Sequence, residues 1–498
     1  MSSTIDQDTS KEVTSKAHQK AWLLYDSRME MHADLDPDSH QIERPERIIS
    51  IIESLSGLSS KIQTNRNSCP FITIESLEPA SLETIELVHS KEYIQRLAQT
   101  STMKEEQLKE IKTIDCTIQE EKNMENDEDM YFNSHTFLSA RLACAGVIAS
   151  IEATLSSANA PKRALAIVRP PGHHACFQKA MGFCFFNSVV VAAKHALHTG
   201  KSKKVVILDW DIHHGNGTQD LTYEDENILY ISMHRYGKKC GDLFFPGSGT
   251  PKEVGGNENN LEAIGTNVNL AWTCAHMGNS EYAAAMSELI LPLIHGFGAD
   301  LVLVSCGLDA AKGDLIGDCD LLPSMYYSMT QSILETVGNT VPVVVALEGG
   351  YNTSVIAECM SAIALALLNE DWRGEQSASI GNIPKSTDVV SIVEKMDRDC
   401  DKEIMQLKKG REALIPVYNY YASESTNRGN VKNSAIKDIN KTIRCLKSTP
   451  MWHDRDLFQT IPLQFEKVDR VTRQSSRRNK KSVDDVDIMD ISFQSMTL

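Results

Sequence analysis

The stretch Val205-Val-Ile-Leu-Asp-Trp-Asp-Ile-His-His-Gly-Asn-Gly217 decides the fold. An apolar run enters it and two glycines follow, which is typical of a buried strand that ends in a tight turn. Side chains alternate along a strand, so Asp209, Asp211 and His213 would point the same way if the extended form continued past the strand end. A carboxylate and an imidazole two residues apart can bind one ion, and this mixed donor set suits zinc among the divalent metals.

Three other stretches repeat this arrangement of an apolar run followed by polar residues and Gly or Pro. They contain His173 and His174 (residues 169–175), Asp309 (residues 303–311) and Tyr351 (residues 345–351). An isolated Asp-x-His is more often a capped strand end than a metal site. In open parallel sheets, however, ligands bind beyond the carboxyl ends of the strands, so four such ends predict one shared site.

The alternation of buried runs with helical patterns predicts an α/β fold, an open parallel sheet with helices on both faces. We expect strands over residues 22–25, 71–74, 164–168, 205–209, 228–233, 267–271, 301–305 and 343–347. We expect the main helices after residue 45 and over residues 130–155, 187–198, 280–297, 324–337 and 353–368.

The composition predicts an ordered body with extensions on both sides. Residues 1–19 read as a disordered tail, 20–372 as the catalytic body, 373–422 as a linker with a helical extension, and 423–498 as a largely disordered tail. The apolar spacing over 389–407 could pack on the body or on a partner. The basic cluster 477–481 is either a nuclear address or a solvated tail, and 484–491 could be a partner motif.

Bulk properties restrict the function. With 41% hydrophobic and 23% charged residues the chain is globular in composition, and its net charge of −17 argues against non-specific nucleic-acid binding. None of the 12 cysteines forms a C-x-x-C pair, which favours reduced thiols in a cytosolic or nuclear protein. We find no signal-peptide core and no apolar run of about 18 residues, so we expect no membrane association.

The residues of the shared site suit a metal ion that lowers the pKa of a bound water and polarises a carbonyl. Asp211, His213 and Asp309 supply three ligands, which leaves the open position that a catalytic zinc needs. His173 and His174 are candidates for the general base, and Asp209 and Asn216 lie where each could orient one imidazole. Tyr351, after two glycines, could donate to a developing oxyanion, although a tyrosine after a strand can equally be core.

Loop residues around these strand ends are weaker candidates. Gly182-Phe183 and Phe244-Phe245 could wall a narrow channel, but each aromatic taken singly would more often be core. His32 and His40 are more often loop histidines than ligands, and His195 and His198 fall on a predicted helix as ordinary surface or core residues.

Several segments resemble, in the same order, the zinc-dependent histone deacetylases. They are RPPGHHACFQKAMGFCFFN (169–187), DWDIHHGNGT (209–218), FFPGSG (244–249), GLDAAKGD (307–314) and EGGYN (348–352). The DWD triplet and Asn216, together with ERPERI (43–48) and DMYFNSHTF (129–137), resemble the class II branch of fungi and plants. The resemblance covers about residues 20–370.

The resemblance implies an arginase/deacetylase-type fold and hydrolysis of N6-acetyl-lysine to lysine and acetate. It implies that Asp211, His213 and Asp309 bind zinc, that His174 is the general base and acid with His173 as its electrostatic helper, and that Tyr351 polarises the acetyl carbonyl. Gly182, Phe183 and Phe245 match the substrate tunnel. Asp209, Ser232 and Met233 match a structural potassium site.

Departures from the family pattern bear on substrate choice. Ile316 stands where the polyamine-deacetylase branch carries a Glu, which favours acetyl-lysine over a cationic substrate. Leu308 and Leu315 replace the usual Phe and Pro and could alter the rim. The acidic loop at Asp127–Asp129 is expected to hold the substrate backbone.

The expected substrates are therefore acetylated histone tails or other acetylated proteins. Corepressor-type protein partners, a role in repression, and a nuclear location with a cytoplasmic share are implied in the same way. The alternatives are a polyamine deacetylase and a catalytically weak scaffold in a repressor complex.

Overall fold

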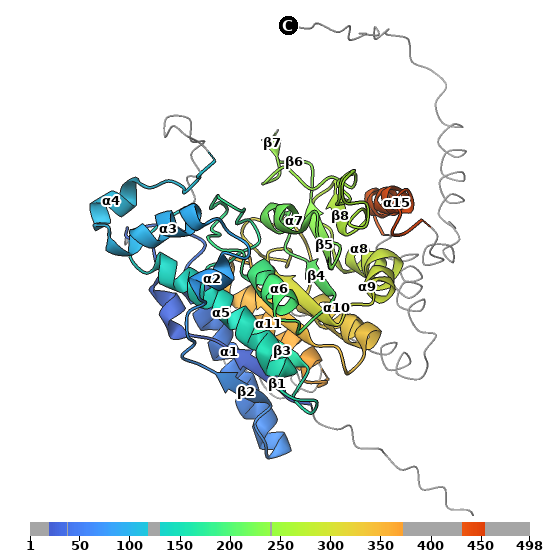
Figure 1. The fold of residues 1–498 in the computed structure, drawn as a ribbon. Coiled ribbons are helices and arrows are strands. Elements are labelled where there is room, and N and C mark those ends of the chain that lie inside the picture. Colours follow the sequence, from blue (N-terminus) through green and yellow to red (C-terminus); the bar gives the residue numbers. More distant parts are fainter. Residues whose placement is uncertain (1–18, 37, 118–129, 240–241, 372–430, 454–498) are drawn as a thin grey trace, which may run out of the picture. The chain divides into compact units, whose positions relative to one another are not determined.

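The computed structural model describes residues 19–36, 38–117, 130–239, 242–371 and 431–453. Its centre is a parallel sheet of eight strands in the order β2-β1-β3-β10-β9-β4-β5-β8 (Figure 1). The strands are β1 (Ala21–Leu24), β2 (Phe71–Ile74), β3 (Arg163–Ala166), β4 (Val205–Asp209), β5 (Ile228–Arg235), β8 (Asn267–Trp272), β9 (Leu301–Cys306) and β10 (Val343–Leu347). A short antiparallel ribbon joins β6 (Lys238–Lys239) to β7 (Asp242–Leu243).

The predicted fold class and all eight predicted strands are confirmed, with ends that differ by no more than two residues. The residues of the six strands from β3 to β10 that lie in this sheet are buried throughout, as expected where helices cover both faces. The register aligns the strand ends that carry the site, since Asp209 pairs with Ser232 on one side and with Ser305 on the other.

Helices pack in two layers against the sheet. In one group, α1 (Glu46–Arg66) and α10 (Pro323–Val337) both pack on α11 (Thr353–Leu367). In the other, α5 (Thr136–Leu155) packs on α6 (Ser188–His198) (Figure 1). The shorter helical segments are η1 (Ser27–Met31), α2 (Leu82–Ile85), α3 (Lys91–Gln99), η2 (Thr100–Thr102), α4 (Glu105–Glu110) and α7 (Asn216–Thr222).

Two helices start directly after site-bearing turns. Asn187 caps α6, and its side chain accepts a hydrogen bond from the Val190 amide. Asn352 caps α11 and accepts from the Val355 amide. Such caps satisfy amides that a helix start leaves unpaired, so they fix where the preceding turn must end.

The helix predicted over residues 280–297 is interrupted. The chain forms α8 (Asn279–Ala285), a π-helical turn η4 (Met286–Ile290) and α9 (Leu291–Phe297). Pro292 lacks an amide hydrogen and stands near the start of α9. A wider turn before it accommodates the missing donor, which a periodicity argument does not detect.

The prediction of a largely disordered segment after residue 423 is wrong for residues 431–453. Here α15 (Asn433–Lys447) packs against β8, the edge strand of the sheet (Figure 1). The Asp438 carboxylate accepts from the Thr273 amide at 2.9 Å, and the buried Trp452 indole donates to Gly265 O at 2.8 Å. Apolar residues at helical spacing, among them Ala435, Ile439 and Leu446, bury the inner face.

One described helix, α5, is long and apolar enough to span a membrane by length and composition. Of its most apolar window, 67% is buried within the fold, as in a core helix. The tails 1–18 and 454–498 and the segments 118–129 and 372–430 lie outside the described residues. The predictions for 389–407, 477–481, 484–491 and Asp127–Asp129 fall in these ranges.

Candidate metal centre and active site

Three side chains from two strand ends converge on one point. Asp211 and His213 follow β4, and Asp309 follows β9. One ligand atom from each lies within 4.8 Å of the others, and all three residues are buried. The His213 Nδ1 atom is 3.1 Å from Asp211 Oδ1 and 3.0 Å from Asp309 Oδ2. This is the donor set predicted from the sequence.

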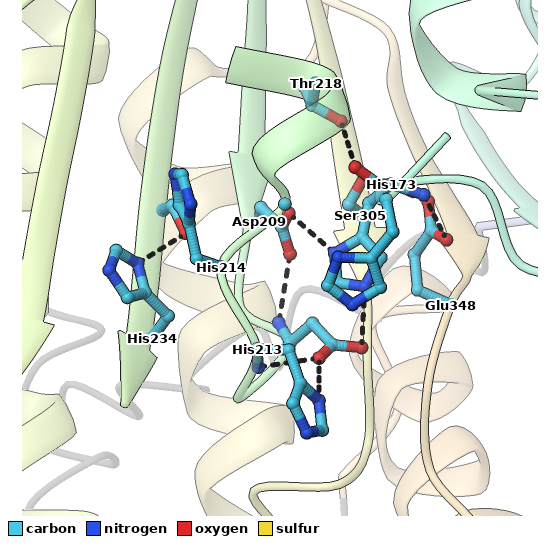
Figure 2. A network of polar contacts seen from close by, with 12 residues as sticks. His173, Asp209, His213, His214, Thr218, His234, Ser305 and Glu348 are labelled. Atoms are coloured by element: carbon cyan, nitrogen blue, oxygen red, sulfur yellow. Dashed lines mark hydrogen bonds and ion pairs between the residues drawn. The ribbon is translucent and has the colours of Figure 1, made fainter. Parts of the chain in front are cut away.

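Asp209 does not join this cluster. The expectation that it points the same way as Asp211 and His213 fails because β4 ends at Asp209 and the chain bends directly after it. Its Oδ1 atom accepts from the Asp211 amide at 3.1 Å, while Oδ2 faces His173 (Figure 2).

The electrostatics of the three-residue cluster fit a cation. Burial raises the pKa of Asp309 to about 7, and the neighbouring Asp211 charge acts in the same direction. Burial alone would lower the pKa of His213, but hydrogen bonds to Asp211 and Asp309 raise it to about 9. Two buried carboxylates beside each other require positive charge, and two carboxylates with one imidazole are donors that suit a divalent metal such as zinc.

The chain approaches this cluster so closely that a side chain is excluded at one point. A Cβ atom on Gly349 would lie 2.5 Å from both Asp211 Oδ2 and Asp309 Oδ2. The Gly349 amide donates to Asp211 Oδ2 at 2.9 Å. Glycine is therefore required at position 349, because any side chain there would collide with the two carboxylates.

The tandem histidines have different partners, as expected from their neighbours in the sequence. His173 Nδ1 donates to Asp209 Oδ2 at 3.1 Å, and His174 Nδ1 donates to Asn216 Oδ1 at 2.8 Å. Their rings lie 4.0 Å apart between centroids. With Nδ1 protonated, the Nε2 atom of His174 has a free lone pair that can accept a proton.

These partners separate the basicities of the two imidazoles. Burial alone would lower the pKa of His173, but the carboxylates of Asp211 and Asp209 outweigh it and raise that pKa to about 10. Burial lowers the pKa of His174 well below its usual value, and the positive charges of His173 and His213 lower it further. At neutral pH, His173 holds a proton and His174 is a neutral base.

Tyr351 is buried and uncharged. Burial raises the pKa of its phenol well above the usual value, so the hydroxyl keeps its proton and can donate. The Arg47 guanidinium lies 5.0 Å from the centre of its ring and donates through Nε to Gly350 O at 2.6 Å. The Tyr351 amide donates to Asp314 Oδ2 at 2.7 Å.

The predicted tunnel residues gather beside His174. Phe245 packs edge-on against His174 with centroids 5.0 Å apart, and Phe183 lies 5.7 Å from Tyr351. Gly182 has a φ of 55°, and a Cβ atom there would lie 2.5 Å from the His174 ring and 3.1 Å from the Phe245 ring. Phe245 is 42% exposed, so its ring faces solvent at the mouth of the site.

A second aromatic ring packs against the imidazole of the three-residue cluster. Phe244 stacks on His213 with centroids 5.0 Å apart and planes inclined by 11°. The Arg235 guanidinium lies 4.6 Å from the centre of the Phe244 ring and pairs with Asp318 at 2.9 Å. Ile316 lies two residues before Asp318, and its amide donates to Asp314 Oδ1 at 2.9 Å. Leu315 beside it is 58% exposed at this rim, while Leu308 is buried.

The proposed potassium-site residues lie on neighbouring strands. Asp209 pairs in register with Ser232, and Met233 follows. Ser232 Oγ is 2.8 Å from His234 Nδ1. The other histidines considered from the sequence lie apart from the metal cluster. His32 is buried against Tyr131, and His195 pairs with Glu152 at 3.1 Å.

Sequence reasoning missed buried residues that hold the site from behind. Arg47 and Arg169 both pair with Glu43 at 2.8 Å, and all three side chains are fully buried. Tyr230 donates to Asp209 Oδ2 at 3.0 Å. The available signal was the spacing of Glu43 and Arg47, four residues apart where a helix was predicted to begin, although this spacing alone does not show that the pair is buried.

Known proteins are similar to this chain in sequence and in fold. Residues 41–367 match the histone deacetylase domain. The chain is 38% identical over 358 residues to Histone deacetylase clr3 of Schizosaccharomyces pombe, covering 71% of this chain and 49% of that protein. It is 35% identical over 364 residues to Histone deacetylase HDA1 of Saccharomyces cerevisiae, covering 70% and 48%.

Plant proteins match as well. The chain is 34% identical over 384 residues to Histone deacetylase 15 of Arabidopsis thaliana, covering 76% of this chain and 63% of that protein. The crystal structure of the HDA15 HD domain superposes with a TM-score of 0.60 at 28% identity, covering 86% of this chain and 99% of that one. The chain spans about half the length of clr3 and HDA1.

The parallel sheet is that of the arginase/deacetylase α/β fold, and the family match covers the strands that carry the Asp-His-Asp cluster, the tandem histidines and Tyr351. The chain belongs to the histone deacetylase family, and its similarity to clr3, HDA1 and HDA15 places it with the class II type.

Proposed function

We propose that this protein is a zinc-dependent lysine deacetylase that hydrolyses N6-acetyl-lysine in histones or other proteins. One observation carries the proposal: a buried cluster of Asp211, His213 and Asp309 lies beside a neutral His174 and a protonated Tyr351. The cluster would hold the zinc ion. When bound there, zinc would polarise the acetyl carbonyl and lower the pKa of a water.

The side chains around the cluster divide the proton work. His174 accepts a proton from the attacking water through Nε2 and returns it to the leaving lysine amine as the C–N bond breaks. His173 keeps its proton because Asp209 and Asp211 stabilise it, so it acts as a fixed positive charge. The Tyr351 hydroxyl donates to the acetyl oxygen, which becomes more negative as the water oxygen bonds to the carbonyl carbon.

The mouth of the site suits an apolar rod with an amide at its end. Acetylation removes the lysine charge, and Phe183 and Phe245 offer ring faces for the methylene chain. Ile316 offers no carboxylate to a cationic substrate, which disfavours polyamines. A scaffold without turnover is disfavoured because the ligands, both histidines and Tyr351 are all present.

The similarity to the family also supports a proposal for the biological setting. We place the activity in chromatin regulation and transcriptional repression, in the nucleus with a cytoplasmic share, with corepressor-type proteins as partners. Clr3 and HDA1 are named histone deacetylases, and this likeness supports histone tails as substrates. A structural potassium ion at Asp209, Ser232 and Met233 would stabilise the end of β4, where the ligand-bearing turn begins.

The test is turnover of an acetyl-lysine histone-tail peptide by the purified full chain, with acetyl-spermidine alongside and Asp309→Asn as the control. We expect peptide turnover that the control lacks. Turnover of acetyl-spermidine alone would reassign the enzyme to polyamines. Silence on both substrates with zinc bound would favour the scaffold.

Tyr351→Phe tests the role of the phenol. We expect a folded variant that keeps zinc and loses about a hundred- to a thousandfold in kcat, the usual effect of removing one oxyanion donor. Circular dichroism and metal content serve as controls for the kinetic comparison. Undiminished turnover would remove Tyr351 from the mechanism.

A further inference from the structure

Glu348 is a fully buried carboxylate that the proposed reaction does not use. It follows β10 directly and stands between the tandem-histidine turn and the end of β9 (Figure 2). Its main-chain amide donates to Cys306 O at 3.1 Å, which extends the pairing of β10 with β9 by one residue. This hydrogen bond fixes the backbone of Glu348, so its side chain starts from a fixed position.

The carboxylate binds the backbone of the turn that carries the general base. Glu348 Oε2 accepts from the Gly172 amide at 2.6 Å and from the His173 amide at 3.2 Å. Oε1 accepts from Ser305 Oγ at 3.2 Å. Both of the amide hydrogen bonds end on Oε2, so this one oxygen fixes two successive amides of the turn.

The other side of this turn has no room to move. A Cβ atom on Gly172 would lie 2.7 Å from the Ser188 amide nitrogen and 2.8 Å from Phe186 O. The turn is thus held between the start of α6 and the Glu348 carboxylate. Losing the carboxylate would leave two buried amides without this acceptor and would allow the turn to shift.

The backbone of Glu348 is tied to the second catalytic turn. Its carbonyl accepts from the Arg47 guanidinium, which also donates to Gly350 O. The amide of the next residue, Gly349, donates to Asp211 Oδ2 at 2.9 Å, and a Cβ atom there would lie 2.5 Å from Asp309 Oδ2. Residues 348–351 form one short segment, so the position of Tyr351 and the position of the carboxylate are set together.

We propose that Glu348 is a positioning residue that couples the two catalytic turns, holding the His173-His174 turn in register with the glycine turn that carries Tyr351. The proposal deepens the proposed deacetylase function and rests on it for its kinetic part. Burying a carboxylate costs free energy, and an apolar residue is often tolerated in its place. At Glu348 this cost is offset by the Gly172 and His173 amides, which need a buried acceptor.

The test compares Glu348→Ala and Glu348→Gln with wild type, in the full chain loaded with zinc. Glu288→Gln is the matched control, because Glu288 is a half-buried glutamate in η4 whose Oε2 has no hydrogen-bond partner among the described residues. The readouts are kcat and KM on the acetyl-lysine peptide, zinc content, and hydrogen exchange of the peptide spanning residues 169–176.

For Glu348→Ala we expect kcat to fall about a hundredfold with KM changed less than about threefold, because a misplaced base costs turnover and not chain binding. Amide exchange in 169–176 should rise at least about tenfold. Glu348→Gln, which keeps one acceptor oxygen, should recover about a tenth or more of wild-type kcat. Zinc content should be unchanged, and Glu288→Gln should match wild type in every readout.

Two results would overturn the coupling role: Glu348→Gln no better than Glu348→Ala, or unchanged exchange in 169–176. Loss of zinc in both variants would make Glu348 a support of the metal cluster instead. If Glu348→Ala does not fold, Glu348→Gln against Glu288→Gln decides, with a kcat loss of about three- to tenfold expected. If wild type shows no turnover while the Glu348 variants still show raised amide exchange in 169–176, the proposed deacetylase function is refuted. The positioning role of Glu348 would then remain.

Discussion

Two His-His pairs follow two strands of the same sheet, β3 and β4, which are separated by β10 and β9, and the two pairs have different surroundings. His173-His174 follows β3, and His213-His214 follows β4. In the first pair both rings face the site, 4.0 Å apart. In the second, His213 turns to the carboxylates while His214 turns away, 4.6 Å from His234 (Figure 2). The dipeptide alone does not define the role of an imidazole; its hydrogen-bond partners do.

His214 and His234 form a neutral structural pair. His214 bonds Ser248 Oγ at 2.8 Å and Gln219 Oε1 at 3.1 Å, and His234 Nε2 donates to Gly249 O at 2.9 Å. Burial lowers the pKa of His214 well below its usual value and that of His234 to about 3. These rings hold the loop that follows Phe244 and Phe245.

The largest expected difference separates His213 from His214. His213→Ala should lose zinc and at least about a thousandfold in kcat/KM, because it removes one of the three proposed metal ligands. His214→Gln should keep zinc and most of the turnover and lose about 1–3 kcal/mol of stability, the cost of disturbing a buried hydrogen-bonded group. Metal analysis, kinetics and urea unfolding separate the two, and equal zinc loss in both variants would abolish the distinction.

The next difference lies within the first pair. His174→Gln removes the proposed general base and should lower kcat by about a thousandfold. His173→Gln removes only the fixed charge and should lower kcat by about ten- to a hundredfold. Single-turnover kinetics on the acetyl-lysine peptide would measure the difference between the two variants. A larger loss at His173 would exchange the two roles.

Exchanging the partners should move the pH dependence. Asn216→Asp places a carboxylate against His174 and raises the pKa of that imidazole from its depressed value. The base must be neutral to act, so the acid-side fall of kcat/KM should move to higher pH by about one unit. An unchanged acid limb would mean that another group titrates there.

The smallest expected effect is a pH dependence of stability from His234. Its folded pKa of about 3 lies below the unfolded value of 6.5, so the unfolded chain binds a proton that the native state excludes. This stability contribution is complete above pH about 6.5 and is lost as pH falls, by about 2 kcal/mol at pH 5. The stability difference between wild type and His234→Gln, from urea unfolding, should shrink accordingly. A constant difference would show that His234 has the same pKa in the native and the unfolded protein.

The sequence predicted what depends on pattern. Apolar runs located all eight strands of the sheet, and the residues after them supplied the Asp-His-Asp cluster. Local pattern predicted the end of β4 at Asp209 but could not show how the chain bends after it, because that bend depends on contacts with neighbouring strands. Nor could it separate His214 from His213, since Ser248 and His234 approach from elsewhere in the chain.

Other features depended on long-range contacts. Helix α15 buries its apolar face only because the edge of β8 is available about 160 residues earlier in the chain. Glu348 and Arg47 read as ordinary charges, and their burial follows from amides and carbonyls that the fold brings to them. Pattern identifies the strand ends, whereas tertiary contacts decide which polar group serves which.

The central claim is that one metal ion, at Asp211, His213 and Asp309, supports lysine deacetylation. The most direct measurement is the titration of metal-stripped full-length protein with zinc while turnover of an acetyl-lysine histone-tail peptide is followed. Turnover should rise from the baseline and reach its plateau at about one ion per chain, as expected for a single three-ligand site. Turnover that is independent of added zinc, or that is absent at full zinc occupancy, would contradict the account.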